Sequence, residues 1–453
     1  MAGLMVSISG VRGIIGEGLT PEVALQFAQA FGTYCNGQPV VVGRDTRVSG
    51  EMITHAVISG LLAVGNKVWQ IGISPTPTTQ LATEKLEAAG GLMITASHNP
   101  IMWNGIKMLA SDGLFLDAKE AEAVLKLRNQ GTFAYQSWDR IGVVEEYPYA
   151  LEDHINAVLS LPFLHTEQIR ARKFKVVADC INGAGAVILP RFLKELGCDI
   201  AILNGTPDGR FPRMPEPLPE NLGEVARAVR QYGADLGVVV DPDADRLALV
   251  SNRGVPLGEE YTLALAVDFL LQRKRGPVVV NVSTSRVIDD IAGKYDCPVT
   301  RTRVGEINVA KRMREVGAVI GGEGNGGVIL PDVHLGRDSI VGIALVLQKL
   351  AETRAGLHEL YEQLPQYKMV KAKIDLPPGC EPREVVAALQ KKYSTEKLDL
   401  TDGVKILRSH SWVQVRASNT EPIIRIMSEA PSQQEANALA QELTRATLAF
   451  AKA

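Results

Sequence analysis

Short apolar runs alternate with amphipathic helical segments three times in succession along this chain of 453 residues. The apolar runs are QPVVVG, KVWQIG and GLMIT in the first block, FKVVADC, CDIAIL and DLGVVVD in the second, and PVVVNV, CPVTRT and AVIGGEG in the third. Such alternation predicts βαβ units on mostly parallel sheets, because a parallel strand is buried on both faces and reaches its neighbour through a helical crossover. The chain is therefore expected to be of the α/β class.

The polar stretches between the blocks bear on the number of domains. QSWDRIGVVEEYPYALEDH and SNRGVPLGEEY stand where boundaries are expected, which favours three domains over one large doubly wound sheet. After LPQYKMVKAKIDLPPG the pattern changes to one helix, a hairpin of two short strands, the strand IIRIMSE and a final helix. We therefore predict three similar mixed-sheet α/β domains over residues 1–150, 151–254 and 255–367, and a smaller α+β domain over 368–453.

Charge and composition limit the classes of partner. A net charge of -3 gives no general attraction to nucleic acid or to an anionic membrane, so a bound anion must be drawn by local basic groups. No apolar stretch reaches membrane-spanning length, and MAGLMVSISGVRG lacks the features of a signal peptide, which predicts a cytoplasmic protein. The cysteines show no metal-type or disulfide spacing and are expected to be buried small hydrophobes: Cys35, Cys180, Cys198, Cys297 and Cys380.

Polar side chains follow the strand GLMI in the stretch ITASHNP. Ligands of open α/β sheets bind beyond the carboxyl ends of the strands, so Thr95, Ser97, His98 and Asn99 are candidate site residues. A serine hydroxyl is a weak nucleophile until a base or a metal activates it. The alternative is an ordinary turn or helix cap, for which Ser, Asn and Pro are common residues.

Three carboxylates alternate in VVVDPDADRLA, directly after a second apolar strand. Asp241, Asp243 and Asp245 repel one another unless a cation compensates them, and their spacing lets them turn toward one point, which predicts a Mg²⁺ site. The loop lacks the glycine and glutamate of an EF-hand. Arg246 follows and is placed to bind a phosphate near the metal. A solvated acidic turn is the alternative.

The stretch GGEGNGGVI combines glycines with Glu323 and Asn325. Glycines let a ligand approach the backbone closely, and a carboxylate with an amide suits the hydroxyls of a sugar. The glycine spacing differs from the dinucleotide-binding fingerprint. A plain turn between two strands explains the glycines almost as well.

Two further stretches carry basic groups. The loop VRASNTEPIIRI of the tail has the donors of a phosphate cradle, with a polar hairpin loop as the alternative. Near the N-terminus, GVRG places Arg12 between glycines. The candidate cradle residues are Arg416, Ser418, Asn419, Thr420 and Arg425.

A nucleophilic serine, a three-carboxylate metal loop, a polyol-binding loop and a separate phosphate cradle together indicate phosphoryl transfer on a phosphorylated sugar. A metal-dependent phosphatase shares the serine and the metal, but it does not need a second phosphate cradle. A non-catalytic sugar-phosphate sensor leaves the serine and the three aspartates unexplained.

The four motifs TASHNP, DPDADR, GEGNGG and RASNTEPIIRI, in this order, resemble those of the α-D-phosphohexomutases. The resemblance covers essentially the whole chain. It implies four domains around a central cleft, with Ser97 carrying a phosphoryl group that is given to a hexose monophosphate and recovered from a bisphosphate intermediate. It also implies one Mg²⁺ bound by a phosphoserine oxygen and the three aspartates, and hexose 1,6-bisphosphate as activator.

The resemblance further implies a role for each remaining candidate. Lys107 and His98 match positions that move protons or stabilise charge, and Arg12 and Arg246 contact the transferring phosphate. Glu323 and Asn325 contact sugar hydroxyls. The tail loop, with Arg416, Ser418, Asn419, Thr420 and Arg425, holds the other phosphate.

The substrate implied is a phosphosugar. GEGNGG followed by VILPDVHLGRD looks most like members described as phosphoglucosamine mutases, which favours glucosamine 6-phosphate over mannose or glucose phosphates. Asn325, Gly326 and Gly327 stand where many bacterial members have Ser-Gly-His, so the usual loop signature does not apply. His334 is either a site residue or part of a surface turn, and the sequence does not distinguish a monomer from a homodimer.

Overall fold

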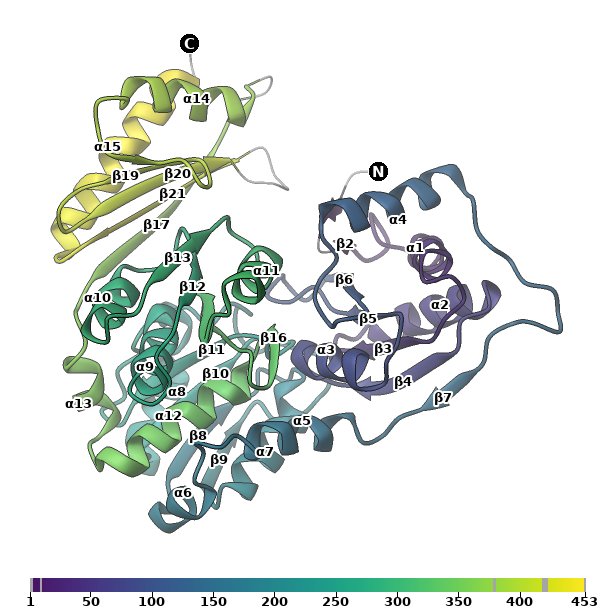
Figure 1. Cartoon of the computed structure of the whole chain (residues 1–453), viewed down its shortest axis with the longest axis horizontal. Helices are drawn as coiled ribbons and strands as arrows, with labels where there is room; N and C mark the ends of the chain where they lie inside the picture. The colour runs from purple at the N-terminus through teal and green to yellow at the C-terminus, as the bar shows by residue number, and fades with distance from the viewer. Residues whose placement is uncertain (1–2, 9, 378–379, 418–422, 452–453) are drawn as a thin grey trace.

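The computed structural model describes residues 3–8, 10–377, 380–417 and 423–451. These residues form four β-sheets in chain order, each accompanied by helices (Figure 1). The predicted multi-domain α/β architecture is confirmed. The boundaries proposed at residues 150, 254 and 367 remain predictions.

The first sheet has seven strands in the order β1-β2-β6-β5-β3-β4-β7. Helices α1, α2 and α4 share one hydrophobic core with its strands, and α3 packs on the other face. The strands are β1 (Leu4–Ser7), β2 (Gly10–Ile14), β3 (Val40–Arg44), β4 (Val68–Ile73), β5 (Gly90–Ile94), β6 (Trp103–Ala110) and β7 (Val144–Glu146). The helices are α1 (Pro21–Tyr34), α2 (Gly50–Ala63), α3 (Thr76–Lys85) and α4 (Ala118–Gln130).

The second and third sheets repeat the pattern with fewer strands, in the orders β11-β10-β8-β9 and β13-β12-β14-β15-β16. The strands of the second sheet are β8 (Lys175–Asp179), β9 (Asp199–Leu203), β10 (Leu236–Val240) and β11 (Leu247–Ser251). Those of the third are β12 (Val278–Asn281), β13 (Val299–Thr302), β14 (Ile320–Glu323), β15 (Gly327–Leu330) and β16 (His334–Arg337). Their helices are α5 (Ala150–Leu159), α6 (Thr166–Arg172), α7 (Gly185–Glu195), η1 (Pro219–Asn221), α8 (Gly223–Tyr232), α9 (Glu259–Leu271), α10 (Val287–Lys294), α11 (Glu306–Val316), α12 (Ser339–Thr353) and α13 (Leu357–Glu362).

These three sheets are mixed, and only the second is mostly parallel. Each has parallel strands on one side, as the alternating pattern predicts, and antiparallel strands on the other. The antiparallel side arises because the chain leaves the centre through a direct return, β5 to β6, β10 to β11 and β14 to β15, in place of a helical crossover. The turns of these returns carry the candidate site residues.

Side-chain caps explain where several helices begin. Thr20 accepts a hydrogen bond from the backbone of Val23 at the start of α1, and Asp117 forms a capping box with Glu120 at the start of α4. Asp338 accepts from two backbone N–H groups at the start of α12. Each cap satisfies N–H groups that have no partner within the helix.

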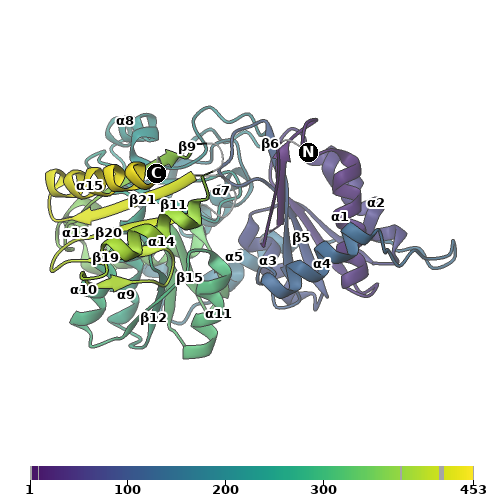
Figure 2. The ribbon, with the colours of Figure 1, turned by 90° about the horizontal axis from the view of Figure 1, so that it is seen from above.

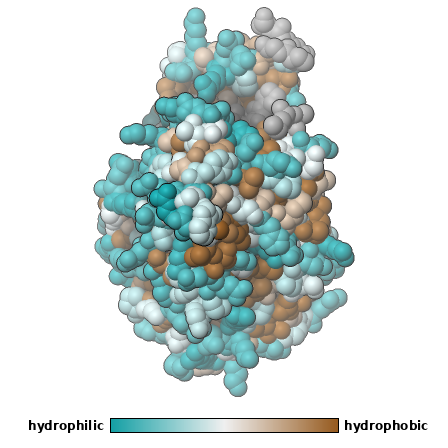
Figure 3. Space-filling model, turned by 90° about the vertical axis from the view of Figure 1, so that its right-hand side faces the viewer, coloured by the Kyte–Doolittle hydropathy of each residue, from teal (hydrophilic) through white to brown (hydrophobic). Residues whose placement is uncertain are grey.

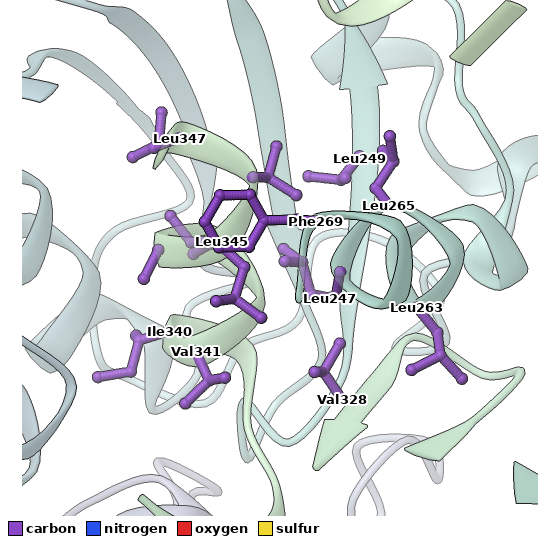
Figure 4. Close-up of a cluster of buried hydrophobic side chains, with 14 of the residues drawn as sticks. Leu247, Leu249, Leu263, Leu265, Phe269, Val328, Ile340, Val341, Leu345 and Leu347 are labelled. Carbon is purple, nitrogen blue, oxygen red and sulfur yellow. The ribbon is translucent and has the colours of Figure 1, made fainter. Parts of the chain in front are cut away.

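The second and third sheets share one hydrophobic core. Helices α9 and α12 lie in its centre, and α9 is buried along its whole length. A helix that is buried on every side has no solvated face, which explains why apolar residues predominate in its sequence. Figure 4 shows leucines of β11 packed against both helices, with Phe269 between them. The contact makes the two units one continuous body.

The fourth sheet is entirely antiparallel, in the order β17-β21-β20-β19-β18. Figures 1 and 2 show this smaller unit above the third sheet. The sequence analysis did not anticipate β17, whose repeated lysines suit an edge strand. Its strands are β17 (Lys368–Asp375), β18 (Leu398–Asp399), β19 (Val404–Leu407), β20 (Trp412–Ala417) and β21 (Ile423–Ala430), and its helices are α14 (Pro382–Lys392) and α15 (Gln433–Ala451).

Exposed apolar side chains lie on the segment between α4 and β7, at the first sheet. Trp138 of this segment is 87% exposed, and Tyr135, Ile141 and Val143 are also exposed. Figure 3 shows apolar groups set among hydrophilic ones on this side of the molecule. Among the helices that the structure describes, none combines the length and apolar character needed to cross a membrane.

The five cysteines are all free thiols. Cys35 and Cys180 are buried as expected, whereas Cys198, Cys297 and Cys380 are half-buried. Burial raises the pKa of the Cys35 and Cys180 thiols to about 12, so these two remain protonated and unreactive near neutral pH.

Candidate active site

Ser97 lies in the turn between β5 and β6 and is only 1% exposed. Its backbone is in the left-handed region, with φ of 48°, and its N–H donates to Thr95 Oγ1 at 2.9 Å. The Ser97 hydroxyl donates to Asp241 Oδ2 at 3.1 Å and lies 3.4 Å from His98 Nδ1. Serine and acidic loop, 144 residues apart in sequence, therefore meet in space.

Asp241, Asp243 and Asp245 form a fully buried cluster at the turn between β10 and β11. One carboxylate oxygen from each lies within 4.8 Å of the others. Burial, together with the charges of Asp245 and Asp243, raises the pKa of Asp241 well above its usual range. The Oδ1 atoms of Asp243 and Asp245 are buried and find no hydrogen-bond partner among the described residues. Oxygen ligands of this kind fit a hard divalent cation.

Lys107 on β6 lies inside this acidic cluster. Its ammonium donates to Asp243 Oδ2 at 2.5 Å and to Asp245 Oδ2 at 3.3 Å, and Thr76 also donates to Asp243. Burial opposes the charged form, but the two carboxylates outweigh it and raise the pKa of Lys107. The lysine is therefore charged and partly compensates the three aspartates.

Two further basic groups lie near the serine turn and the acidic cluster. Arg12 on β2 donates to Asn99 Oδ1 at 3.1 Å, and the Nε atom of Arg246 lies 3.7 Å from Asp245. The Arg246 charge, burial and the Arg12 charge lower the pKa of His98 well below its usual value. His98 is therefore neutral near pH 7, and two guanidinium groups supply the positive charge for an anion here.

Glu323 and Asn325 lie in the hairpin turn between β14 and β15. Glu323 is buried and accepts hydrogen bonds from Asn281 at 2.8 Å and from the backbone of Gly305 at 3.0 Å. The Asn325 amide lies 3.5 Å from Glu323, and the Gly326 carbonyl accepts from the backbone N–H of Leu247 at 3.0 Å. The glycine-rich stretch is thus a turn between two strands, and this turn also reaches the strand that follows the acidic loop.

Arg337 at the end of β16 joins these groups, and the sequence analysis did not identify it. It donates to Asp245 at 2.7 Å, to Glu323 at 2.7 Å and to Glu306 at 2.8 Å. Glu306 in turn accepts from Gln80 of the first domain at 2.9 Å. Because Arg337 is a polar residue at the carboxyl end of a strand, the rule that found the aspartates also marks it.

His334 belongs to a different buried cluster, with His154 and Asp338. The Gly336 N–H donates to His334 Nδ1 at 3.1 Å, so Nε2 carries the ring hydrogen and donates to Asp338 Oδ2 at 3.1 Å. His154 Nε2 meets the same oxygen at 2.7 Å. Asp338 therefore accepts hydrogen bonds from both histidines, and the cluster forms a hydrogen-bonded joint between the second and third domains.

Arg416 and Arg425 face each other across the pair β20–β21. The Nε atom of Arg416 is buried and has no hydrogen-bond partner within the described ranges. Burial lowers the pKa of Arg416, and the Arg425 charge adds to this effect. Such a pair of guanidinium groups is suited to an anion. The other residues of the predicted cradle, Ser418, Asn419 and Thr420, lie outside the described residues.

Models of the four domains of one family match almost the entire chain. The alpha/beta/alpha domains I, II and III of the phosphoglucomutase/phosphomannomutase family match residues 4–134, 152–254 and 258–367, and its C-terminal domain matches residues 371–446.

Individual proteins agree with these matches. A phosphoglucomutase/phosphomannomutase of Thermococcus kodakarensis is 42% identical over 450 residues, covering 96% of each chain. A protein of Methanopyrus kandleri named "probable phosphoglucosamine mutase" is 42% identical over 441 residues, covering 96% of this chain and 95% of its own. The crystal structure of a phosphoglucomutase/phosphomannomutase family protein of Burkholderia thailandensis gives a TM-score of 0.86 at 26% identity, covering 99% of this chain and 98% of that one. The chain belongs to the phosphoglucomutase/phosphomannomutase family.

Proposed function

We propose that this enzyme is a phosphohexomutase that interconverts hexose 6-phosphate and hexose 1-phosphate through a phosphorylated Ser97. The observation that carries the proposal is the contact of the Ser97 hydroxyl with Asp241, at 3.1 Å, inside a buried three-carboxylate cluster. A serine that serves as phosphoryl carrier needs a compensated negative charge beside it, and such a cluster offers a site for the compensating cation.

Asp241, Asp243 and Asp245 would hold one Mg²⁺ together with an oxygen of phosphorylated Ser97. The unpartnered Oδ1 atoms of Asp243 and Asp245 support this assignment, because buried carboxylate oxygens without hydrogen bonds are otherwise costly. When bound, the ion supplies neutralisation of the charge on the transferring group.

The protein's own residues position the phosphoryl group and move protons. Arg12 and Arg246 would bind the transferring phosphate with their guanidinium groups. Neutral His98, 3.4 Å from the serine hydroxyl, is suited to accept its proton, and charged Lys107 is suited to donate one to a leaving oxygen.

The remaining residues would hold the sugar. Glu323 and Asn325 would contact its hydroxyls, and Arg416, Ser418, Asn419, Thr420 and Arg425 would hold the phosphate that does not react. A mutase needs this second cradle because the bisphosphate intermediate must turn over without being lost, and hexose 1,6-bisphosphate would act as activator by phosphorylating Ser97.

Glucosamine 6-phosphate is the preferred substrate in this proposal. The stretch GEGNGG, followed by VILPDVHLGRD, supports it, as does the name of the Methanopyrus kandleri relative. The name of the Thermococcus kodakarensis relative supports glucose and mannose phosphates as the next candidates.

One assay tests the proposal. The Mg²⁺-loaded enzyme is incubated with glucosamine, glucose or mannose 6-phosphate and a trace of hexose 1,6-bisphosphate, and the 1-phosphate and free phosphate are measured. We expect 1-phosphate, fastest from glucosamine 6-phosphate, and its loss in Ser97→Ala. Ser428→Ala is the control, because Ser428 is a buried serine of the fourth domain that donates to the Ala436 carbonyl. Net release of phosphate would indicate a phosphatase, and full activity of Ser97→Ala would overturn the phosphoserine mechanism.

The proposal also places the enzyme in the cytoplasm. Its partners in this proposal are phosphosugars, and neither nucleic acid nor a membrane. The oligomeric state, monomer or homodimer, is measured by size-exclusion chromatography with light scattering.

A further inference from the structure

Arg47, which follows β3 in the stretch GRDTR, is the largest fully buried side chain of the protein that the structure describes. It belongs to none of the four motifs. Every N–H of its guanidinium group is used. Nε donates to Asp45 at 3.2 Å, and the four remaining N–H groups donate, at 2.7–2.8 Å, to the backbone carbonyls of Ser97, Asn99, Pro100 and Trp103.

Asp45 reaches the same turn by a second route. Its Oδ2 accepts a hydrogen bond from Thr95 Oγ1 at 2.6 Å, and Thr95 Oγ1 accepts from the Ser97 N–H at 2.9 Å. Its Oδ1 accepts from the Arg47 backbone at 2.9 Å. Asp45 and Arg47 therefore hold both backbone groups of Ser97. Asp45 holds the N–H through Thr95, and Arg47 binds the carbonyl directly.

Such holding is needed because Ser97 has an unfavourable backbone. Its φ of 48° lies in the left-handed region, which a non-glycine residue occupies only when its surroundings impose it. The conformation directs the hydroxyl to Asp241 at 3.1 Å. Without the contacts between Arg47 and these carbonyls, the backbone of the turn can adopt a more favourable conformation. The Ser97 hydroxyl can then move away from the acidic cluster.

The same short segment is also anchored to the second domain, which carries the aspartates. Thr46 Oγ1 donates to the Asn182 carbonyl at 2.7 Å, and the Arg47 guanidinium lies over the Phe211 ring, 5.0 Å from its centroid. A Cβ atom on Gly209 would lie only 2.1 Å from the Thr46 carbonyl oxygen, so the two backbones are in close contact. The segment therefore lies between the serine turn and the domain of the acidic loop.

We propose that Asp45 and Arg47 form a clamp that fixes the serine turn against the second domain, and that Arg47 is a positioning residue for phosphoryl transfer at Ser97. Arg47 does not touch the reacting atoms. It acts by keeping Ser97 Oγ at the distance and direction that the acidic cluster requires. The catalytic part of this inference rests on the proposed function, whereas the structural part does not.

Arg47→Lys tests the clamp. The ammonium keeps the charge that compensates Asp45 but has three N–H groups in place of five, so at least two of the five hydrogen bonds, and at least one carbonyl contact, are lost. Phosphorylation of Ser97 by hexose 1,6-bisphosphate, followed by intact mass, is expected to slow about 100-fold, because a small displacement of a reacting group has an effect of this size. The Mg²⁺ affinity measured by calorimetry is expected to remain unchanged, since the aspartates are untouched.

Two further variants separate positioning from stability. Thr95→Val removes only the second route and is expected to slow phosphorylation less than Arg47→Lys. Arg273→Lys makes the same chemical change at a residue that donates to the Phe269 carbonyl and pairs with Glu352, in the third domain. It is expected to phosphorylate at the wild-type rate.

Hydrogen exchange distinguishes failure of the clamp from failure of the proposed function. In Arg47→Lys, exchange over residues 95–104 is expected to accelerate, while exchange over residues 241–246 stays as in the wild type. Unchanged exchange over residues 95–104, a wild-type phosphorylation rate, or a parallel loss of Mg²⁺ affinity would overturn the clamp. Faster exchange of the turn in an enzyme whose wild type takes no phosphoryl group would support the clamp and contradict the proposed function.

Discussion

Lys107 occupies the position of a counter-ion within the acidic cluster. Its ammonium contacts Asp243 and Asp245, whose other carboxylate oxygens have no hydrogen-bond partner in the described part of the chain. Arg246 and Arg337 lie on Asp245 as well, whereas Lys107 is the cation that pairs with Asp243. The carboxylate oxygens that remain without a partner suit a further cation.

Replacing Lys107 changes how strongly Mg²⁺ stabilises the protein. Lys107→Met leaves the buried Asp243 without its ion-pair partner, so the free energy of unfolding of the metal-free protein is expected to fall by about 3–5 kcal/mol. Saturating Mg²⁺ is expected to recover more of this stability than it adds to the wild type, because a ligand that binds only the folded state stabilises it by mass action. Thermal or denaturant unfolding with and without Mg²⁺ measures both effects.

Lys349→Met is the matched control for this prediction. Lys349 is a buried lysine that pairs with Asp268, between α12 and α9. Its loss is expected to destabilise the protein equally with and without Mg²⁺. An Mg²⁺ effect of wild-type size in Lys107→Met would contradict the view that the lysine compensates the metal ligands.

Residues of the site were predictable where polar groups follow a recognisable strand. The rule that polar residues directly after a strand are candidate site residues located Ser97 and the aspartates. The stretches GRDTR and HLGRD satisfy the same rule, so it could also have identified Arg47 and Arg337. The sequence did not reveal which groups these arginines bind, because contacts between a guanidinium group and carbonyls 50 to 56 residues away leave no local sequence pattern. The meeting of Ser97 with Asp241 likewise depends on how two separate sheets pack.

In the hairpin of β14 and β15, one short stretch of sequence forms a turn and also carries a residue of the candidate site. Its glycines permit the turn, and the turn presents Glu323 to Arg337. Gly326 has φ of 86°, and a Cβ atom there would lie 2.4 Å from the Leu247 carbonyl oxygen. The glycine is therefore required both by the turn and by contact with β11.

Gly326→Ala tests this close contact. The added methyl group must displace the hairpin from β11, so we expect a loss of about 1–3 kcal/mol beyond the cost of the backbone conformation alone. Gly233→Ala supplies that reference cost, because Gly233 has φ of 62° and open space around its Cβ position. Urea unfolding of both variants gives the difference, and equal losses would show that the hairpin tolerates the displacement.

At the level of elements, the prediction succeeded for the three alternating blocks because their periodicity is strong. The predicted runs QPVVVG, KVWQIG and GLMIT agree with β3, β4 and β5, and the predicted final helix agrees with α15. The strands β1, β2, β6, β7, β11, β16 and β17 were not predicted. Their burial is decided by neighbours that are distant in sequence, so their own residues show little alternation.

The complete site exists only in the whole molecule. Ser97 and Lys107 come from the first domain, the aspartates from the second, Glu323 and Arg337 from the third, and the Arg416 pair from the fourth. Figures 1 and 2 show the fourth sheet resting on the third. Ser283 donates to Gln414 at 2.7 Å across this contact, so the position of the proposed phosphate cradle relative to the rest of the site depends on how the fourth domain docks.

Lys405 makes that docking sensitive to pH. It is 2% exposed, lies over the Trp412 ring and donates to the Val282 carbonyl of the third domain at 2.6 Å. Burial, together with the Arg301 charge, lowers the pKa of Lys405 from 10.5 to about 7, against the opposing charges of Glu429, Asp289 and Asp399. Between these two pH values the separated or unfolded state binds a proton that the docked state lacks. Lys405 therefore weakens docking as the pH falls toward 7, by at most about 1.4 kcal/mol per pH unit.

Lys405→Met removes this dependence, because methionine carries no titrating group. Relative to the wild type, its free energy of unfolding is expected to be higher near pH 7, with the difference shrinking as the pH rises toward 10.5. Hydrogen exchange over residues 282–286 and 404–414 at several pH values reports the same trend at the contact itself. Lys373→Met, on an exposed position of β17, is the control and is expected to follow the wild type, since its side chain is solvated in both states. A difference between Lys405→Met and the wild type that does not change with pH would show that Lys405 stays charged when the fourth domain docks.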